Sequence, residues 1–331
     1  MIDLVTRWTK RTGVRALAGA AGLAAVLAVQ GCASPQLLET GSAIASARLT
    51  DEYYVSRDGE RLAVSHWQAA RPKAVFVAVH GFNEYAGVFR LPAPWFARRG
   101  ISTYAYDQRG FGRTAAHKRG GWAGGDVMAD DLKGFVGQVR VRHPGLPVYV
   151  VGISMGGAVA MKAAAGGGLD ADGLVLVAPA IWGWRSMNPI LKTALWVTAH
   201  TVPDQTATGS QLKIWPSDNI EWLKEYSRDP QLIKQSRFDT LYGLVTLMDE
   251  AAAAAPRLGL PVLYLYGGKD EVVPAAPTRK VMAALSQPNR VEVYPQGYHM
   301  LLHDKQRETV YADIMDWIDG LPVAAPVAGR P

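Results

Sequence analysis

The stretch Val148-Tyr-Val-Val-Gly-Ile-Ser-Met-Gly-Gly157 decides the fold of this chain. An apolar, β-branched run leads into the pattern Gly-x-Ser-x-Gly with Ser154 at its centre, and good helix formers continue from there to Ala165. A sharp strand-to-helix turn exposes a serine hydroxyl, and its glycines let the backbone pack closely. We therefore predict a nucleophile elbow with Ser154 as the nucleophile. The alternative is an ordinary turn in which this serine only caps the helix.

Strand and helix signals alternate around this stretch. A hairpin is predicted around the turn dipeptide Asp58-Gly59, from strands at 53–55 and 62–67. Continuous apolar runs, typical of strands buried on both faces, follow at 74–79, 101–106, 148–151, 174–178, 262–266 and 291–294. Because helix-length segments separate most of them, the sequence predicts an α/β fold: a mostly parallel central sheet with helices on both faces.

One interval, 181–247, lacks any clear strand-like run. It is rich in tryptophan and proline, and 190–200 is compatible with a helix. We predict a helical cap inserted over the carboxyl edge of the sheet, where open α/β sheets bind ligands. The folded domain is predicted to span 51–320, with a flexible tail at 321–331.

A serine nucleophile needs a base and an acid that orients the base, and the sequence supplies both in the order serine, acid, histidine. Asp270 follows one buried strand and His299 follows the next, so both are expected at the same sheet edge as Ser154. Asp270 could instead be a turn or capping residue. His299 could be a polar loop residue, and His303 is a rival base that we expect about one turn down the following helix.

An oxyanion hole is predicted where the strand at 74–79 enters a His80-Gly81 turn. The backbone amides of Phe82 and Met155 would stabilise the negative charge of the tetrahedral intermediate. His80 precedes the turn and has no obvious acidic partner, so a structural role is expected for it.

Five ordered motifs together resemble the monoacylglycerol lipase and lysophospholipase group of α/β-hydrolases, over residues 50 to 320. They are His80–Tyr85, Tyr106–Arg113, Gly152–Gly156, Gly267–Asp270 and Gly297–His299. The resemblance implies an α/β-hydrolase fold, Ser154, Asp270 and His299 as catalytic residues, and Phe82 and Met155 as oxyanion donors. It also implies that the Asp107–Arg113 loop supports the site without taking part in the chemistry.

The first 31 residues have the features of an export signal, with a basic start and an apolar run at 16–29 that is short for a membrane span. The run ends at Val29-Gln-Gly-Cys32, which resembles a bacterial lipobox apart from Gln30. We expect Cys32 to carry a lipid, 32–50 to be a lipid-anchored tether, and the protein to reside in the cell envelope, at the outer rather than the inner membrane. The alternative is an incidental cysteine near an ordinary cleavage site.

Charge and motifs exclude several other classes. The formal net charge is +6, of which residues 1–31 contribute +3 from four basic residues and one aspartate. The sequence has no basic stripe with interleaved aromatic residues, so nucleic-acid binding is not indicated. It also has no His-Glu-x-x-His motif and no paired cysteines, so a metal site is not indicated. A loose glycine pattern at 110–115 runs on into further glycines instead of opening a helix, so no dinucleotide and no cofactor is expected.

The sequence therefore predicts a lipid-anchored serine hydrolase that cleaves monoacylglycerol or lysophospholipid esters without a cofactor. One rival is a short-chain esterase, thioesterase or amidase with the same triad. Another is a non-catalytic binding lipoprotein of the envelope. The substrate prediction rests on analogy, because a fold hosts many functions, and the oligomeric state is left open.

Overall fold

The computed structural model describes residues 34–43, 46–114, 118–209, 214–286 and 288–321. The predicted export signal, Cys32 and nearly all of the predicted tail lie outside these residues.

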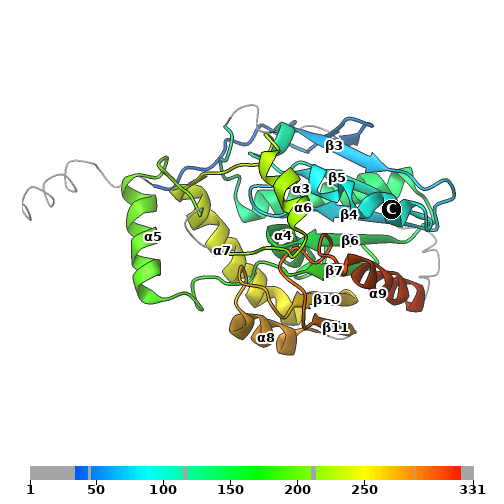
Figure 1. Cartoon of the computed structure of the whole chain (residues 1–331). Coiled ribbons are helices and arrows are strands. Elements are labelled where there is room, and N and C mark those ends of the chain that lie inside the picture. Colours follow the sequence, from blue (N-terminus) through cyan, green and yellow to red (C-terminus); the bar gives the residue numbers. More distant parts are fainter. Residues whose placement is uncertain (1–33, 44–45, 115–117, 210–213, 287, 322–331) are drawn as a thin grey trace, which may run out of the picture.

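A nine-stranded sheet forms the centre of the molecule, in the order β1-β2-β3-β5-β4-β6-β7-β10-β11 (Figure 1). The six strands from β5 to β11 run parallel, whereas β1, β2 and β3 join them as an antiparallel extension. The bounds are β1 Arg48–Leu49, β2 Tyr53–Val55, β3 Arg61–Trp67, β4 Ala74–Val79, β5 Ile101–Tyr106, β6 Val148–Ile153, β7 Gly173–Val177, β10 Val262–Gly267 and β11 Asn289–Tyr294. The predicted α/β fold is confirmed, and each predicted strand lies within two residues of its observed bounds.

Helices cover both faces of the sheet because its central strands are apolar on both sides. One face packs against α3 (Gly125–Arg142), α4 (Met155–Ala164), α7 (Phe238–Ala254) and α8 (Ala275–Ala284). The other packs against α2 (Pro92–Ala97) and α9 (Arg307–Gly320). In β4, Val75, Val77 and Val79 belong to the first core, and Phe76 to the second. This alternation is the two-residue period of a strand that is buried on both faces.

The segment between β7 and β10 departs from the strand-helix alternation. It contains α5 (Pro189–Thr201), α6 (Ile220–Arg228) and α7, and Figure 1 shows α5 lying beyond α7, away from the sheet. The expectation of no strand in this interval is wrong in one detail, since β8 (Thr206–Ala207) pairs with β9 (Ser236–Arg237). Each of these strands is only two residues long and of intermediate hydropathy, so the sequence gives no strand signal. The pairing is visible only in the folded structure.

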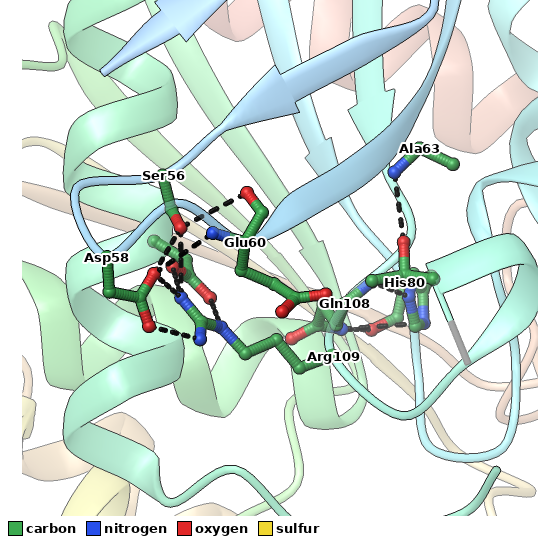
Figure 2. Close-up of polar contacts among 9 residues, drawn as sticks. Ser56, Asp58, Glu60, Ala63, His80, Gln108 and Arg109 are labelled. Atoms are coloured by element: carbon green, nitrogen blue, oxygen red, sulfur yellow. Dashed lines mark hydrogen bonds and ion pairs between the residues drawn. The ribbon is translucent and has the colours of Figure 1, made fainter. Parts of the chain in front are cut away.

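A buried ion cluster joins the opening hairpin to the body of the fold. The Arg109 guanidinium donates to the Asp58 carboxylate at 2.6 and 2.7 Å (Figure 2). It also donates to the Asp131 carboxylate at 2.7 and 2.8 Å. Arg109 and Asp131 are each buried. Because an unpaired buried charge is costly, Arg109 fixes the hairpin turn and α3 in one relative position.

The described chain begins beside the cap. Leu37 forms a bridge with Trp122, and the Trp122 ring fills the space above Gly243 of α7. The segment that contains Leu37 therefore contacts the body next to α7. None of the described helices combines the length and apolar character needed to cross a bilayer.

Candidate active site

Ser154 lies at the tip of the turn between β6 and α4, with φ of 50° and ψ of −116°. Such a conformation costs a residue with a side chain about 1–3 kcal/mol, and the surroundings must hold it in place. Here the Ser154 amide donates to Val177 O at 3.0 Å, and its carbonyl accepts from Ala180 N at 2.9 Å. The Ser154 side chain makes no capping hydrogen bond to α4. Its hydroxyl is thus placed differently from that of a capping serine.

The glycines of the elbow leave no room for any other residue. A Cβ on Gly156 would lie 2.1 Å from the carbonyl oxygen of Val79, at the end of β4. A Cβ on Gly152 would lie 2.6 Å from the carbonyl oxygen of Gly156. The first turn of α4 is therefore pressed directly against two strand ends, as the Gly-x-Ser-x-Gly pattern predicts.

Asp270 and His299 meet after consecutive parallel strands. The Asp270 Oδ2 atom lies 2.8 Å from His299 Nδ1, and both side chains are buried. The other carboxylate oxygen accepts from the amides of Val272 and Val273 at 2.8 and 2.9 Å. Because a carboxylate can only accept, Nδ1 of His299 donates in this contact, and in the neutral ring Nε2 then carries the free lone pair. This is the tautomer that a general base requires.

Ser154 shares the sheet edge with this pair, since β6, β7, β10 and β11 are parallel neighbours. In the described chain no hydrogen bond joins the Ser154 hydroxyl to His299. Catalytic hydrogen bonds are often long in the free enzyme and tighten when substrate binds. The structure thus brings Asp270 and His299 together directly and places Ser154 at the same edge.

His80 orients the predicted oxyanion turn. Its Nε2 accepts from the Gln108 amide at 2.9 Å (Figure 2). The proton is therefore on Nδ1, which donates to the Gly81 carbonyl at 2.8 Å. Burial lowers the pKa of His80 to about 4, so the ring is neutral at physiological pH. In a planar trans peptide the C=O and the N–H point in opposite directions. By holding the Gly81 carbonyl, His80 therefore fixes the direction of the Phe82 N–H.

The second predicted donor, Met155, is the first residue of α4, where backbone amides have no partner within the helix. Neither the Phe82 amide nor the Met155 amide donates a hydrogen bond within the described chain. Both amides are thus available to a ligand.

Comparison with known proteins agrees with this geometry. The family model described as serine aminopeptidase S33 matches residues 70–306. The chain belongs to this family. It is 28% identical to a monoacylglycerol lipase from Mycolicibacterium smegmatis, covering 82% of this chain and 98% of that protein. It is 27% identical to a human monoglyceride lipase, covering 84% and 93% respectively. A solved monoglyceride lipase from Saccharomyces cerevisiae, a soluble variant with a substrate analogue, shares the fold, with a TM-score of 0.69, 19% identity, and coverage of 86% and 98%.

In this α/β-hydrolase the rival histidine has a different environment. The prediction that His303 lies on a helix is wrong, because residues 300–306 form turns and α9 starts only at Arg307. The Asp304 carboxylate accepts from the Tyr298 amide and the Ser217 hydroxyl, and these contacts hold the chain in turns. The His303 Nε2 bonds to the Val88 carbonyl at 2.8 Å, and its ring stacks on Trp222. Complete burial lowers its pKa to about 4.

Asp107 makes structural hydrogen bonds near the site, which is the kind of role that the family resemblance implied for its loop. One oxygen of its buried carboxylate accepts from the Ala86 amide at 2.9 Å, and the other accepts from the amide and Nε of Arg113. These contacts join the end of β5 to the chain that follows the oxyanion turn.

Sequence reasoning did not single out Glu84 and Tyr226. Glu84 is 4% exposed, and its Oε2 accepts from the Gly81 amide at 2.8 Å while its Oε1 accepts from the Tyr226 hydroxyl at 2.5 Å. A glutamate three residues after a His-Gly pair is the only signal in the sequence, and it does not indicate burial.

Substitution of His299 should mainly lower activity, whereas substitution of His303 should mainly lower stability. His299→Gln removes the predicted general base and is expected to lower kcat/KM by a factor on the order of 10⁴ or more. His303→Gln loses a buried hydrogen bond and a ring contact, so stability should fall by about 1–3 kcal/mol while activity stays within about tenfold. Steady-state kinetics with a soluble ester and urea unfolding measure both. A large kinetic loss confined to the His303 variant would reverse the assignment.

Proposed function

We propose that this chain is a serine hydrolase that cleaves monoacylglycerol or lysophospholipid-like carboxylic esters through an acyl-Ser154 intermediate. The observation that carries the proposal is the 2.8 Å contact between Asp270 and His299 at the sheet edge that bears the strained serine. Membership of the serine aminopeptidase S33 family and the names of the two lipase relatives support it.

In the proposed mechanism each group has a defined role. The His299 Nε2 accepts the hydroxyl proton as Ser154 attacks the ester carbonyl, and then returns a proton to the leaving alcohol. Asp270 holds the imidazole and stabilises its charged form. Water, activated by the same histidine, then hydrolyses the acyl-enzyme. The amides of Phe82 and Met155 stabilise the oxyanion, each by about 3 kcal/mol, and the chemistry needs no cofactor.

The surface of the cap supports an apolar substrate. A cavity of about 380 Å³ lies between α5 and α7 and is separate from the proposed catalytic residues, none of which lines it. Its lining is largely aromatic: Trp184, Lys192, Thr193, Trp196 and Tyr242. α5 also exposes the apolar side chains of Ile190, Leu191 and Val197 to solvent. Such a group of exposed apolar side chains is typical of a surface that binds an apolar partner or ligand. Burial of an acyl chain is worth about 0.8 kcal/mol per methylene, enough to select among chain lengths.

We also propose that Cys32 anchors the enzyme to a membrane of the bacterial envelope, with the outer membrane favoured. The lipobox-like sequence supports the anchor. So does the path of the tether, which meets the body at Trp122, next to α7 and the apolar cap. A lipid at residue 32 would hold the cap near the bilayer from which lipid substrates come.

The nucleophile and the substrate class can be tested together. Ser154→Ala should abolish labelling by a fluorophosphonate and hydrolysis of a long-chain monoacylglycerol, with circular dichroism unchanged. On p-nitrophenyl esters the native enzyme should prefer decanoyl over acetyl chains. An acetyl preference would favour the short-chain esterase, and a thioester or amide preference would favour the other enzymatic rivals. Undiminished labelling of the alanine variant would refute the nucleophile, and no turnover by the native protein would favour a binding protein.

Loss of the proposed anchor should change the location of the protein but not its catalytic activity. Cys32→Ser expressed in a bacterial host should move the protein from the membrane pellet to the soluble fraction or leave its precursor unprocessed. The kcat on a soluble ester should stay the same, because Cys32 belongs neither to the proposed triad nor to the proposed oxyanion hole. Metabolic labelling with an alkyne fatty acid, read in the native protein and the variant, measures the modification. Equal labelling of both would exclude Cys32 as the attachment site.

A further inference from the structure

The oxyanion turn, residues 81–85, is bonded to a single stretch of the cap, residues 226–236. Four hydrogen bonds cross between them in the described chain: Tyr226 hydroxyl to Glu84 at 2.5 Å, Tyr85 hydroxyl to Asp229 at 2.6 Å, Asn83 side-chain amide to Ser236 hydroxyl at 2.8 Å, and Ile233 amide to the Asn83 carbonyl at 3.0 Å. Three consecutive residues of the turn thus have partners 142 to 153 residues away. No part of the assigned triad chemistry requires these contacts.

Glu84 connects the cap to the oxyanion donor. Its carboxylate binds the Gly81 N–H on one oxygen and the Tyr226 hydroxyl on the other. The Gly81 carbonyl and the Phe82 N–H belong to the same peptide group. Tyr226, on α6, is therefore two hydrogen bonds away from the residue that directs the Phe82 amide.

The hydrogen bond from the Tyr226 hydroxyl stabilises the ionised form of Glu84, which burial disfavours. Burial raises the pKa of Glu84, and the hydrogen bonds from Tyr226 and Gly81 oppose this change. Without the hydroxyl, a buried carboxylate would keep one donor and would either take up a proton or move. Either response weakens its hold on the Gly81 amide. Gly81 also lies next to the nucleophile, since a Cβ on this residue would be 2.5 Å from Glu84 Oε2 and 3.4 Å from Ser154 Cβ.

Asn83 adds a second connection. Its φ of 63° lies in the left-handed region, which asparagine tolerates better than most residues but which still needs support. Both its carbonyl and its side-chain amide bond to the cap segment. The conformation of the residue next to Phe82 is therefore held from the cap side as well as from the body.

We propose that cap segment 226–236 positions the oxyanion hole, with Tyr226 acting through Glu84 and Ser236 acting through Asn83. The cap then has two functions: it shapes the substrate site and it directs the Phe82 amide at the developing charge. Displacement of α6 lowers transition-state stabilisation without altering the nucleophile or the base. This inference rests on the proposed function, because it assumes that Ser154 is acylated.

Tyr226→Phe tests the proposal by removing one hydroxyl. Loss of an oxyanion donor itself costs a factor of about 10²–10³ in kcat, so an indirect loss of alignment should cost about 10- to 100-fold. The KM for p-nitrophenyl butyrate should stay within about threefold. Binding of a trifluoromethyl ketone, which forms an oxyanion on the serine, should weaken by a similar factor to kcat. All rates are expressed per active site titrated with a fluorophosphonate, so that a misfolded fraction does not count.

Two further variants refine the test. Ser236→Ala should lower kcat in the same direction but by less, because only the Asn83 side-chain contact is lost. Glu84→Gln keeps an oxygen that can accept from Gly81, so it should retain much more activity than Glu84→Ala. Tyr104→Phe is the matched control, since this buried hydroxyl bonds Gln68 and His143 far from the site, and its kcat should be unchanged.

The results separate the two proposals. If Tyr226→Phe keeps its kcat per titrated site, or loses activity only through KM, the cap does not position the oxyanion hole. If both kcat and trifluoromethyl ketone affinity fall while Ser154→Ala is inactive, both proposals are supported. Activity that persists in Ser154→Ala would instead overturn the proposed function itself, whatever the behaviour of Tyr226→Phe.

Discussion

The contact between the first turn of α4 and the end of β4 is the constraint on which the site depends. A single added carbon on Gly156 would come within 2.1 Å of the Val79 carbonyl, so the helix can start this close to the sheet only with glycine at that position. The closeness forces Ser154 into its strained conformation at the tip of the elbow. It also sets the Met155 amide beside the strand that leads into His80 and Gly81. This packing contact consequently brings the predicted nucleophile and the Met155 amide close to the turn that carries the Phe82 amide.

Fixed hydrogen bonds then specify each direction in the site. His80 is neutral and has both ring nitrogens satisfied, so it acts as a rigid link between Gln108 and Gly81. Asp270 is held by two backbone amides and in turn holds His299. These groups are buried, where a hydrogen bond is stronger and a misplaced polar group is more costly than in water. Electrostatic preorganisation of this kind requires no rearrangement at the moment of reaction.

Much of this arrangement could be predicted from the sequence because its signals are local. The β-branched runs defined the strands, and parallel strands bring the residues that follow them to one edge, so Ser154, Asp270 and His299 could be placed without coordinates. The helical position expected for His303 was wrong because a buried carboxylate, Asp304, organises turns there through partners at Ser217 and Tyr298. The partnership of Glu84 with Tyr226 spans 142 residues, and no pattern in either neighbourhood indicates it. Cap contacts of this type depend on how α6 packs, which hydrophobic periodicity does not determine.

A crystal structure of the enzyme inactivated by a long-chain alkyl phosphonate would test the central claim most directly. The phosphorus should be bonded to Ser154 Oγ, and its negatively charged oxygen should lie about 2.7–3.1 Å from the amide nitrogens of both Phe82 and Met155. The His299 Nε2 should lie within hydrogen-bond distance of Ser154 Oγ. An adduct whose oxygen points away from both amides, or an adduct on another residue, would contradict the site described above.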